Sequence, residues 1–176
     1  EDALLVGAMV ITLLRHADRV KMACIAQLVN VIAPIMTQTG GAAWRQTIFY
    51  PYMDGSRFGR GVALDVAPQS STYHDDTFDA VPYLEAVATW DAENQSITLF
   101  AVNRDLESSL PLEGDLRAFP GYKVIGHTTL THSDLKATNS AEHPDNVTPR
   151  ANGDAQVNDG KMLATLPAAS WNVIRL

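Results

Sequence analysis

The sequence lacks several features that tie a protein to a disulfide framework, a membrane or a nucleic acid. One cysteine, Cys24, is present among 176 residues, so no disulfide can form within the chain. The apolar stretch 3–14 is too short to span a bilayer. Because 13 Lys and Arg stand against 20 Asp and Glu, the formal net charge of −7 disfavours a nucleic acid or an anionic membrane surface. We therefore expect neither nucleic acid nor membrane as a partner.

Catalytic and metal-binding patterns are also scarce. The sequence offers no convincing Cys/His zinc spacing, glycine-rich phosphate loop or Ser/His/Asp arrangement, so we expect no metal and no cofactor. The clusters 74–76 and 132–134 each combine histidine with aspartate, but they fall in polar segments without matched partners. We interpret both clusters as solvated surface.

The position of Cys24 bears on the compartment. It lies in the apolar run 22–26, where we expect a buried and unreactive thiol. No basic segment precedes the first apolar stretch, so we expect no signal peptide. The single cysteine and the missing leader together favour the reducing cytoplasm.

Residues 1–59 follow an α/β pattern. Apolar residues surround every side of a helical wheel over 3–14, which predicts a helix buried on most faces. A nearly continuous apolar run over 20–32 predicts a strand covered on both faces, as in a parallel sheet. Residues 44–58 fit a strand or a helix, and we favour a helix with Pro51 near its middle. A lone buried strand needs sheet neighbours, so we expect this part to be the end of a larger α/β domain.

Residues 60–176 change to a period of two, which is typical of strands with one buried face. We predict strands over 62–66, 83–90, 96–102, 110–116, 122–131, 162–166 and 170–176. A turn cluster at 91–94 joins two of them as a hairpin, Pro111 indicates a sheet edge, and 132–159 is predicted as surface loops. Several short strands separated by turns predict a β-sandwich.

Three acidic residues of these strands, Asp65, Glu85 and Asp115, stand at alternate positions. We expect their side chains to point outward from the sandwich, because alternate strand residues face opposite sides of a sheet.

The polar residues Gln27 and Asn30 interrupt the apolar run near its C-terminal end. In a (β/α)₈ barrel the C-terminal ends of the strands line the active site, and an amide can both donate to and accept from sugar hydroxyls. The alternative is that both amides only satisfy neighbouring backbone groups. Trp44, which follows the next loop, is either a stacking surface for a sugar or a packing residue.

Several segments carry a family resemblance in a fixed order. They are 18–35, 48–52, 59–61, 81–85, 100–104, 152–156 and 170–176. Together they resemble the C-terminal part of glycoside hydrolase family 51 α-L-arabinofuranosidases, and 18–35 is similar to the last barrel strand of that family. The resemblance covers essentially the whole chain. It implies a mostly β protein, with the end of a (β/α)₈ TIM barrel over 1–59 and a jelly-roll β-sandwich over 60–176.

The resemblance also implies which steps of the parent enzyme's function depend on this chain and which depend on the rest of the enzyme. The parent would be a retaining glycosidase that releases terminal non-reducing α-L-arabinofuranoside residues from arabinan, arabinoxylan and their oligosaccharides, through an acid/base Glu and a nucleophile Glu. Both glutamates belong to earlier barrel strands, so no residue of this chain is assigned a catalytic role and we expect the isolated chain to be inactive. Gln27 matches a substrate-binding position that hydrogen-bonds the arabinofuranose, whereas Asn30 matches no such position.

Two rival hypotheses concern the sandwich. A stand-alone carbohydrate-binding module usually displays a row of exposed aromatic side chains, and aromatics make up only 7% of this sequence. A structural domain that packs against the barrel and mediates oligomerisation is the interpretation that we favour for 60–176. The resemblance implies as partners arabinofuranosyl oligosaccharides or polysaccharides, the N-terminal barrel portion, and further copies in a homo-oligomer.

Overall fold

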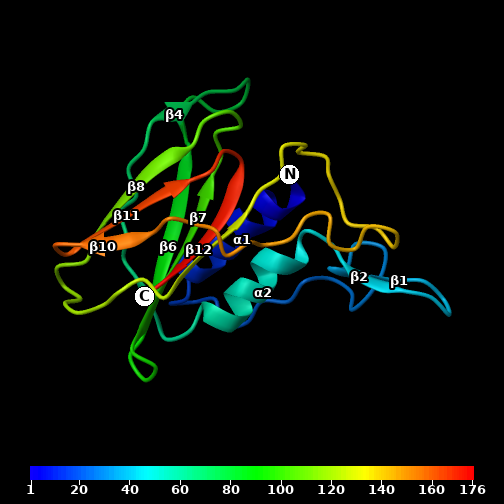
Figure 1. Cartoon of the computed structure of the whole chain (residues 1–176), viewed down its shortest axis with the longest axis horizontal. Helices are drawn as coiled ribbons and strands as arrows, with labels where there is room; N and C mark the ends of the chain where they lie inside the picture. Colours follow the sequence, from blue (N-terminus) through cyan, green and yellow to red (C-terminus); the bar gives the residue numbers. More distant parts are fainter.

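The computed structural model describes the whole chain, residues 1–176, as two helices packed on a set of antiparallel sheets (Figure 1). The helices are α1 (Asp2–Arg15) and α2 (Phe49–Phe58). The strands are β1 (Ile35–Thr37), β2 (Ala43–Arg45), β3 (Val62–Leu64), β4 (Thr72–Tyr73), β5 (Val81–Pro82), β6 (Leu84–Asp91), β7 (Ser96–Asn103), β8 (Leu110–Asp115), β9 (Gly126–Leu130), β10 (Gln156–Asn158), β11 (Lys161–Leu166) and β12 (Ser170–Arg175). Neither helix is long and apolar enough to cross a membrane.

The main sheet has five strands in the order β3-β6-β7-β12-β9. Its centre is the predicted hairpin, in which β6 and β7 pair from Leu84 opposite Asn103 to Asp91 opposite Ser96. The turn is closed by Asp91, whose Oδ1 accepts hydrogen bonds of 3.1 Å from the backbone N–H groups of residues 93 and 94. Aspartate favours such turns because its side chain can replace a backbone acceptor.

A three-stranded sheet, in the order β10-β11-β8, covers one face of the main sheet. The apolar residues buried between the two sheets are Leu84, Ala86, Ile97, Ala101, Leu112, Met162, Ala164, Leu166, Ile174 and Leu176. β8 lies at the edge of its sheet, where Pro111 was expected to place it. The mostly β fold is therefore confirmed, and its two main sheets pack face to face; the jelly-roll connectivity stays a prediction.

The helices cover the other face of the main sheet (Figure 1). The second core joins Ala3, Val10, Ile11, Tyr50, Val87, Phe100, Val102, Leu130, Val147, Trp171 and Val173. At its centre the rings of Phe100 and Trp171 stack with centroids 5.8 Å apart. A Cβ on Gly7 would lie 2.6 Å from the Trp171 ring, so only glycine lets α1 approach the sheet this closely.

Because both faces of the main sheet are covered, its acidic residues do not all reach solvent. Glu85 on β6 is buried, which corrects the expectation that its side chain points outward. The reason is that α1 covers this face of β6 and brings Arg15 to within 3.2 Å of the Glu85 carboxylate. Asp65 and Asp115 are exposed, as expected.

Both predicted helices form, with differences in detail. α1 buries only one face, formed by Ala3, Gly7, Val10 and Ile11, and its opposite face is exposed; the expectation of burial on most sides is wrong. α2 begins at residue 49, so Pro51 lies in its first turn rather than near its middle. That is where proline is tolerated, because the first-turn N–H groups have no acceptor within the helix.

The expected buried strand over 20–32 is absent. This segment forms turns and bends, and most of its residues are exposed, including Cys24, so the expectation of a buried thiol is wrong as well. Apart from the bond between the backbone N–H of Asn30 and the carbonyl oxygen of Ile35 on β1, no strand of the chain pairs with its backbone, and an unpaired strand cannot be buried. The strands β1 and β2 form a short hairpin after it.

The two parts of the chain that the sequence separates at residue 59 share one core. Ala3, Val10 and Tyr50 from the first part pack with Phe100 and Trp171 from the second. The C-cap of α2 is Gly59, as expected for a helix end, and β3 begins three residues later. The assignment of 1–59 to a barrel and of 60–176 to a separate domain stays a prediction.

Candidate functional site

The predicted sugar-binding residue Gln27 lies in an exposed loop. We call residues 20–34 the Gln27 loop. The Gln27 backbone has a φ of 61°, its side chain is exposed, and its amide makes no hydrogen bond within the chain. Asn30 and Val31 also have positive φ values, of 64° and 56°. Such values are strained for residues other than glycine, above all for a β-branched one, and strained backbone is common where a protein binds a ligand.

Asn30 has a different role from Gln27. Its Oδ1 accepts a hydrogen bond of 2.7 Å from the backbone N–H of Thr37, and its Nδ2 donates one of 2.9 Å to the Thr37 hydroxyl. Its own backbone N–H donates to the carbonyl oxygen of Ile35 at 2.8 Å. Asn30 therefore joins the Gln27 loop to β1, and the interpretation that it satisfies neighbouring groups is confirmed for this residue alone.

The Gln27 loop is also held from the side of α2. The Tyr52 hydroxyl donates a hydrogen bond of 2.7 Å to the carbonyl oxygen of Ala23. At the end of the loop, the backbone N–H of Gln46 donates to the carbonyl oxygen of Pro34 at 2.8 Å. These bonds fix both ends of the loop and leave the amide of Gln27 free.

Several large apolar residues that are close to Gln27 in the sequence have exposed side chains. Met22 and Leu28 expose 84% and 83% of their surface, and Val31 and Ile32 are exposed as well. The outer face of α1 adds Leu5, Met9 and Leu13. We call these seven residues the exposed apolar set. Exposed apolar side chains in such number are typical of a surface that another protein segment covers.

Trp44 lies on β2, opposite Met36 of β1, and not at a helix start. Its ring is half-buried, and its indole N–H is buried without a hydrogen-bond acceptor. β2 is attached to the long segment 132–159 by Asn139, whose Nδ2 donates to the carbonyl oxygens of Arg45 and Val147 at 2.9 and 3.0 Å. Whether Trp44 stacks on a sugar stays a prediction. No local sequence pattern points to the role of Asn139.

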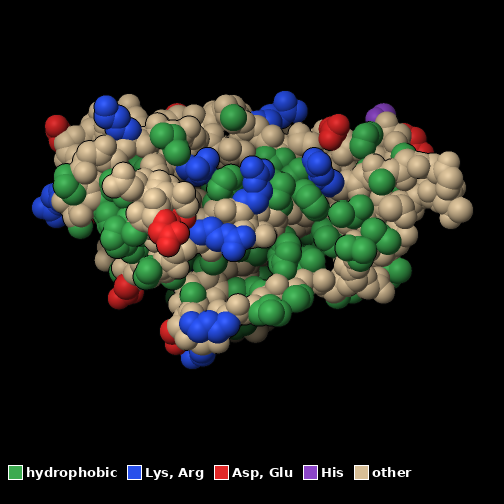
Figure 2. Space-filling view, turned by 90° about the horizontal axis from the view of Figure 1, so that it is seen from below, with side chains coloured by type: hydrophobic (Ala, Val, Ile, Leu, Met, Phe, Trp, Pro, Cys, Tyr) green, Lys and Arg blue, Asp and Glu red, His purple; other side chains and the backbone are tan.

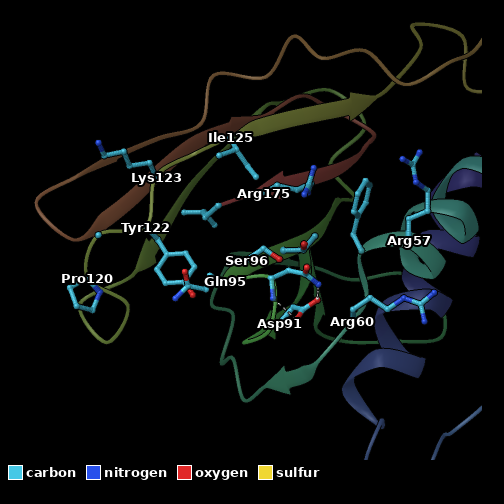
Figure 3. Close-up of a pocket in the computed structure, with 15 residues that line it drawn as sticks. Arg57, Arg60, Asp91, Gln95, Ser96, Pro120, Tyr122, Lys123, Ile125 and Arg175 are labelled. Carbon is cyan, nitrogen blue, oxygen red and sulfur yellow. Dashed lines mark hydrogen bonds between the residues drawn. The ribbon is translucent and has the colours of Figure 1, made fainter.

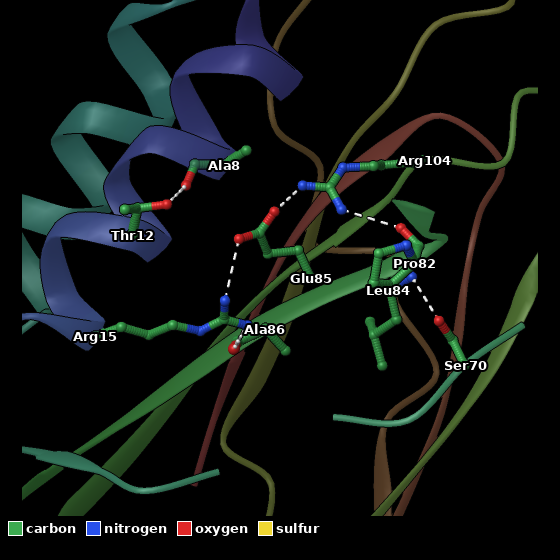
Figure 4. Close-up of polar contacts among 9 residues, drawn as sticks. All are labelled: Ala8, Thr12, Arg15, Ser70, Pro82, Leu84, Glu85, Ala86 and Arg104. Carbon is green, nitrogen blue, oxygen red and sulfur yellow. Dashed lines mark hydrogen bonds and ion pairs between the residues drawn. The ribbon is translucent and has the colours of Figure 1, made fainter. Parts of the chain in front are cut away.

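The two buried carboxylates of the chain are both bound by structural partners. Glu85 accepts a hydrogen bond from Arg15 and a short one from Arg104, whose guanidinium groups approach it from α1 and from the end of β7 (Figure 4). Asp54 on α2 accepts a hydrogen bond of 2.9 Å from the indole N–H of Trp171. Burial raises the pKa of Asp54 above its ordinary value. Each carboxylate therefore contributes to packing between elements.

The buried imidazole of His127 packs against the segment 152–156 and is hydrogen-bonded to it. Its Nδ1 accepts a hydrogen bond of 3.3 Å from the backbone N–H of Ala155, so its Nε2 donates to Oδ1 of Asn172. Burial lowers the pKa of His127, which favours this neutral form. A Cβ on Gly153 would lie 2.0 Å from the imidazole, so glycine is required there.

Other candidate groups stay on the surface. His74, Asp75 and Asp76 are exposed, as expected for a solvated cluster. His132 accepts a hydrogen bond of 3.0 Å at Nδ1 from the backbone N–H of Asp134, which closes a local turn. No three His, Cys, Asp or Glu side chains gather in a geometry that could hold a metal ion.

The fold defines a class of protein: a mostly β domain backed by two helices. Residues 1–170 match the family described as the alpha-L-arabinofuranosidase C-terminal domain, and the chain belongs to that family. It corresponds to the C-terminal part of glycoside hydrolase family 51 α-L-arabinofuranosidases.

Similar proteins with assigned names agree with this. The chain is 55% identical over its whole length to an intracellular exo-α-(1→5)-L-arabinofuranosidase of Halalkalibacterium halodurans and 50% identical to one of Bacillus subtilis. It spans 35% of the length of either relative. Among solved structures, a family 51 α-L-arabinofuranosidase from Bifidobacterium longum matches 99% of the chain with a TM-score of 0.92 and 43% identity, over 34% of its own length.

Proposed function

We propose that this chain is the C-terminal portion of a retaining α-L-arabinofuranosidase that hydrolyses terminal non-reducing α-L-arabinofuranoside residues in arabinan, arabinoxylan and their oligosaccharides. The observation that supports this most strongly is the identity of 55% and 50%, over the whole chain, to two proteins named exo-α-(1→5)-L-arabinofuranosidases. Both relatives are also named intracellular, which supports a cytoplasmic enzyme.

In this proposal residues 1–59 complete a catalytic barrel supplied by the rest of the protein. The exposed apolar set would be covered by that barrel, and the segment 20–32 would gain the strand neighbours that it lacks within the chain. The free amide of Gln27 would then hydrogen-bond the arabinofuranose. Its exposure and lack of partners within the chain support this role.

The reacting groups come from the rest of the enzyme. A retaining glycosidase uses two carboxyl groups roughly 5–5.5 Å apart, one as nucleophile and one as acid/base. Glu85 is held between two arginines and Asp54 is bonded to Trp171, so neither is free for these roles. We expect the 176-residue chain alone to release no arabinose from an aryl arabinofuranoside, and turnover traced to it would contradict the proposal.

We assign the sandwich a structural role, in packing the barrel and in forming a homo-oligomer. A carbohydrate-binding module would need a row of exposed aromatic rings, but Phe78, which exposes 62% of its surface, is the one exposed aromatic side chain here. The sandwich therefore offers little stacking surface of the kind that such modules use.

The proposal for Gln27 is tested in the full-length enzyme. Gln27→Ala should lower kcat/KM for an aryl arabinofuranoside about fivefold, because one neutral hydrogen bond to the sugar contributes about 1 kcal/mol. The matched control is Gln69→Ala, an exposed glutamine of the second part of the chain, which should leave kcat/KM unchanged. Equal kcat/KM values for the two variants would show that Gln27 does not bind the sugar.

A further inference from the structure

A hollow on the surface is lined by four of the eight Lys and Arg residues that form no ion pair in the chain. It lies between the end of α2, the β6–β7 turn and the segment 120–125, with a volume of about 820 Å³ (Figure 3). Its cationic residues are Arg57, Arg60, Lys123 and Arg175, and we call it the basic hollow. Figure 2 shows several Lys and Arg side chains close together on one face of the molecule, although the chain as a whole carries a net charge of −7.

These four cations have no anionic partner. None of them forms an ion pair or donates a side-chain hydrogen bond in the structure, whereas Arg15, Arg104, Arg117, Lys136 and Lys161 all pair with Asp or Glu. One carboxylate, Asp91, also lines the hollow, but it accepts its hydrogen bonds from the residues of its own turn. In the view of Figure 3, Arg175 lies on the wall of the hollow, whereas Arg57, Arg60 and Lys123 stand at its rim with their charged ends directed outward. Four cations against one side-chain carboxylate favour an anionic ligand.

Arg175 is held in place on the wall of the hollow. It ends the strand β12, where its carbonyl oxygen accepts a hydrogen bond of 2.8 Å from the N–H of Ile125. Its guanidinium lies 4.5 Å from the centre of the Phe58 ring, and that of Arg57 lies 5.1 Å from the same ring. Its Nε is buried without an acceptor. A stacked guanidinium with free N–H groups is preorganised to bind a carboxylate.

The rest of the lining suits a polar ring. Tyr122 accepts a hydrogen bond of 3.0 Å from the indole N–H of Trp90, which orients the phenol and leaves its own O–H free to donate. Asn94, Gln95 and Ser96 add amide and hydroxyl groups beside it. An aromatic face surrounded by amides and hydroxyls is the usual environment of a bound sugar.

We propose that the basic hollow binds the carboxylate of a uronic acid residue in an oligosaccharide. The choice of a sugar rests on the proposed function, since uronates are the common anions of plant polysaccharides. The hollow would hold acidic backbones from which neutral arabinose side chains branch.

Calorimetric titration of the full-length enzyme tests this. The probe is trigalacturonate at low ionic strength, and the neutral control is a galactose trisaccharide. We expect saturable binding of the uronide and none of the neutral sugar, with binding weakened by added salt. Arg175→Gln should weaken uronide binding at least about fivefold, because it removes a charge-assisted contact. The matched control, Arg150→Gln, removes an exposed arginine outside the hollow and should change nothing.

A second variant keeps the test valid if Arg175→Gln fails to fold. Arg175 packs on Phe58, so Arg175→Gln could disturb the fold, whereas Arg60 and Lys123 are exposed and their double change to Gln should fold normally. We expect this double variant to weaken uronide binding by a similar factor at an unchanged Tm. Unchanged binding in both variants, equal loss in the Arg150 control, or phosphate binding as tightly as the uronide would each overturn the proposal.

The same preparations separate this inference from the proposed function. Turnover of an aryl arabinofuranoside should be the same in the unaltered enzyme and in the double variant. Normal turnover without uronide binding would reject the basic hollow alone, and uronide binding without any turnover would reject the arabinofuranosidase assignment alone.

Discussion

The five-stranded sheet and the Gln27 loop are both rich in apolar residues, yet they differ completely in burial. β7 lies between β6 and β12 and has a packed layer on each face, so Phe100 and Val102 are inaccessible to water. The Gln27 loop is part of no sheet, and Leu28 exposes 83% of its surface. The difference shows that an apolar run becomes a buried strand only where other segments supply hydrogen bonds and a covering layer.

The largest expected effect comes from removing a core ring. Phe100→Ala should lower the free energy of unfolding of the chain by about 3–5 kcal/mol, because it leaves a cavity beside Trp171. Leu28→Ala, the matched change in the Gln27 loop, should alter it by less than about 0.5 kcal/mol. Urea denaturation followed by circular dichroism measures both. A loss above about 2 kcal/mol for Leu28→Ala would mean that the loop is packed within the chain.

That contrast also sets the limit of what the sequence can predict. The β6–β7 hairpin was predicted correctly, because alternating apolar residues and the turn cluster at 91–94 are local signals. The strand over 20–32 was not, because its apolar pattern is equally local but no strand of this chain forms a sheet with it. A pattern therefore states what a segment can form, and its neighbours decide whether it does.

The site shows the same limit. The buried state of Glu85 depends on α1, which is about 70 residues earlier, and period-two patterning cannot reveal a helix on the outer face of a sheet. Asn139 lies in a polar segment that looks like loop, and only the fold shows that it joins β2 to Val147. The amide of Gln27 was singled out by a family position, and its role in sugar binding stays a prediction that local physics cannot supply.

Breaking the ion pairs of Glu85 should have the next largest effect. Glu85→Gln keeps the shape of the side chain but leaves Arg15 and Arg104 without a negative charge at a buried position. Both arginines are partly exposed, so we expect a loss of about 1–3 kcal/mol in unfolding free energy, below the value for a fully buried pair. Urea denaturation of Glu85→Gln beside Glu113→Gln, an exposed glutamate paired with Lys161, measures the difference. Equal losses would show that burial adds nothing at Glu85.

The smallest expected effect concerns the other buried carboxyl, Asp54, whose partner is neutral. Burial raises its pKa in the folded protein, so the folded state holds the proton at a higher pH than the unfolded chain does. The Asp54 contribution to stability is therefore fully present below the ordinary pKa of an aspartate, about 3.9. It is lost as the pH rises through the raised folded pKa. Asp54→Asn keeps an acceptor for the Trp171 N–H and removes the buried charge, so this part of the pH dependence should disappear.

Thermal unfolding of Asp54→Asn and of the unaltered chain between pH 4 and pH 8 makes the comparison. We expect Asp54→Asn to match the unaltered chain near pH 4 and to equal or exceed its Tm near pH 7, where the unaltered chain must bury a charge or retain a proton. Asp65→Asn, at an exposed aspartate, should leave the pH profile unchanged. A lower Tm for Asp54→Asn at pH 7 would mean that the charged form of Asp54 stabilises the contact between α2 and β12, as the charge of Glu85 does for α1 and β6.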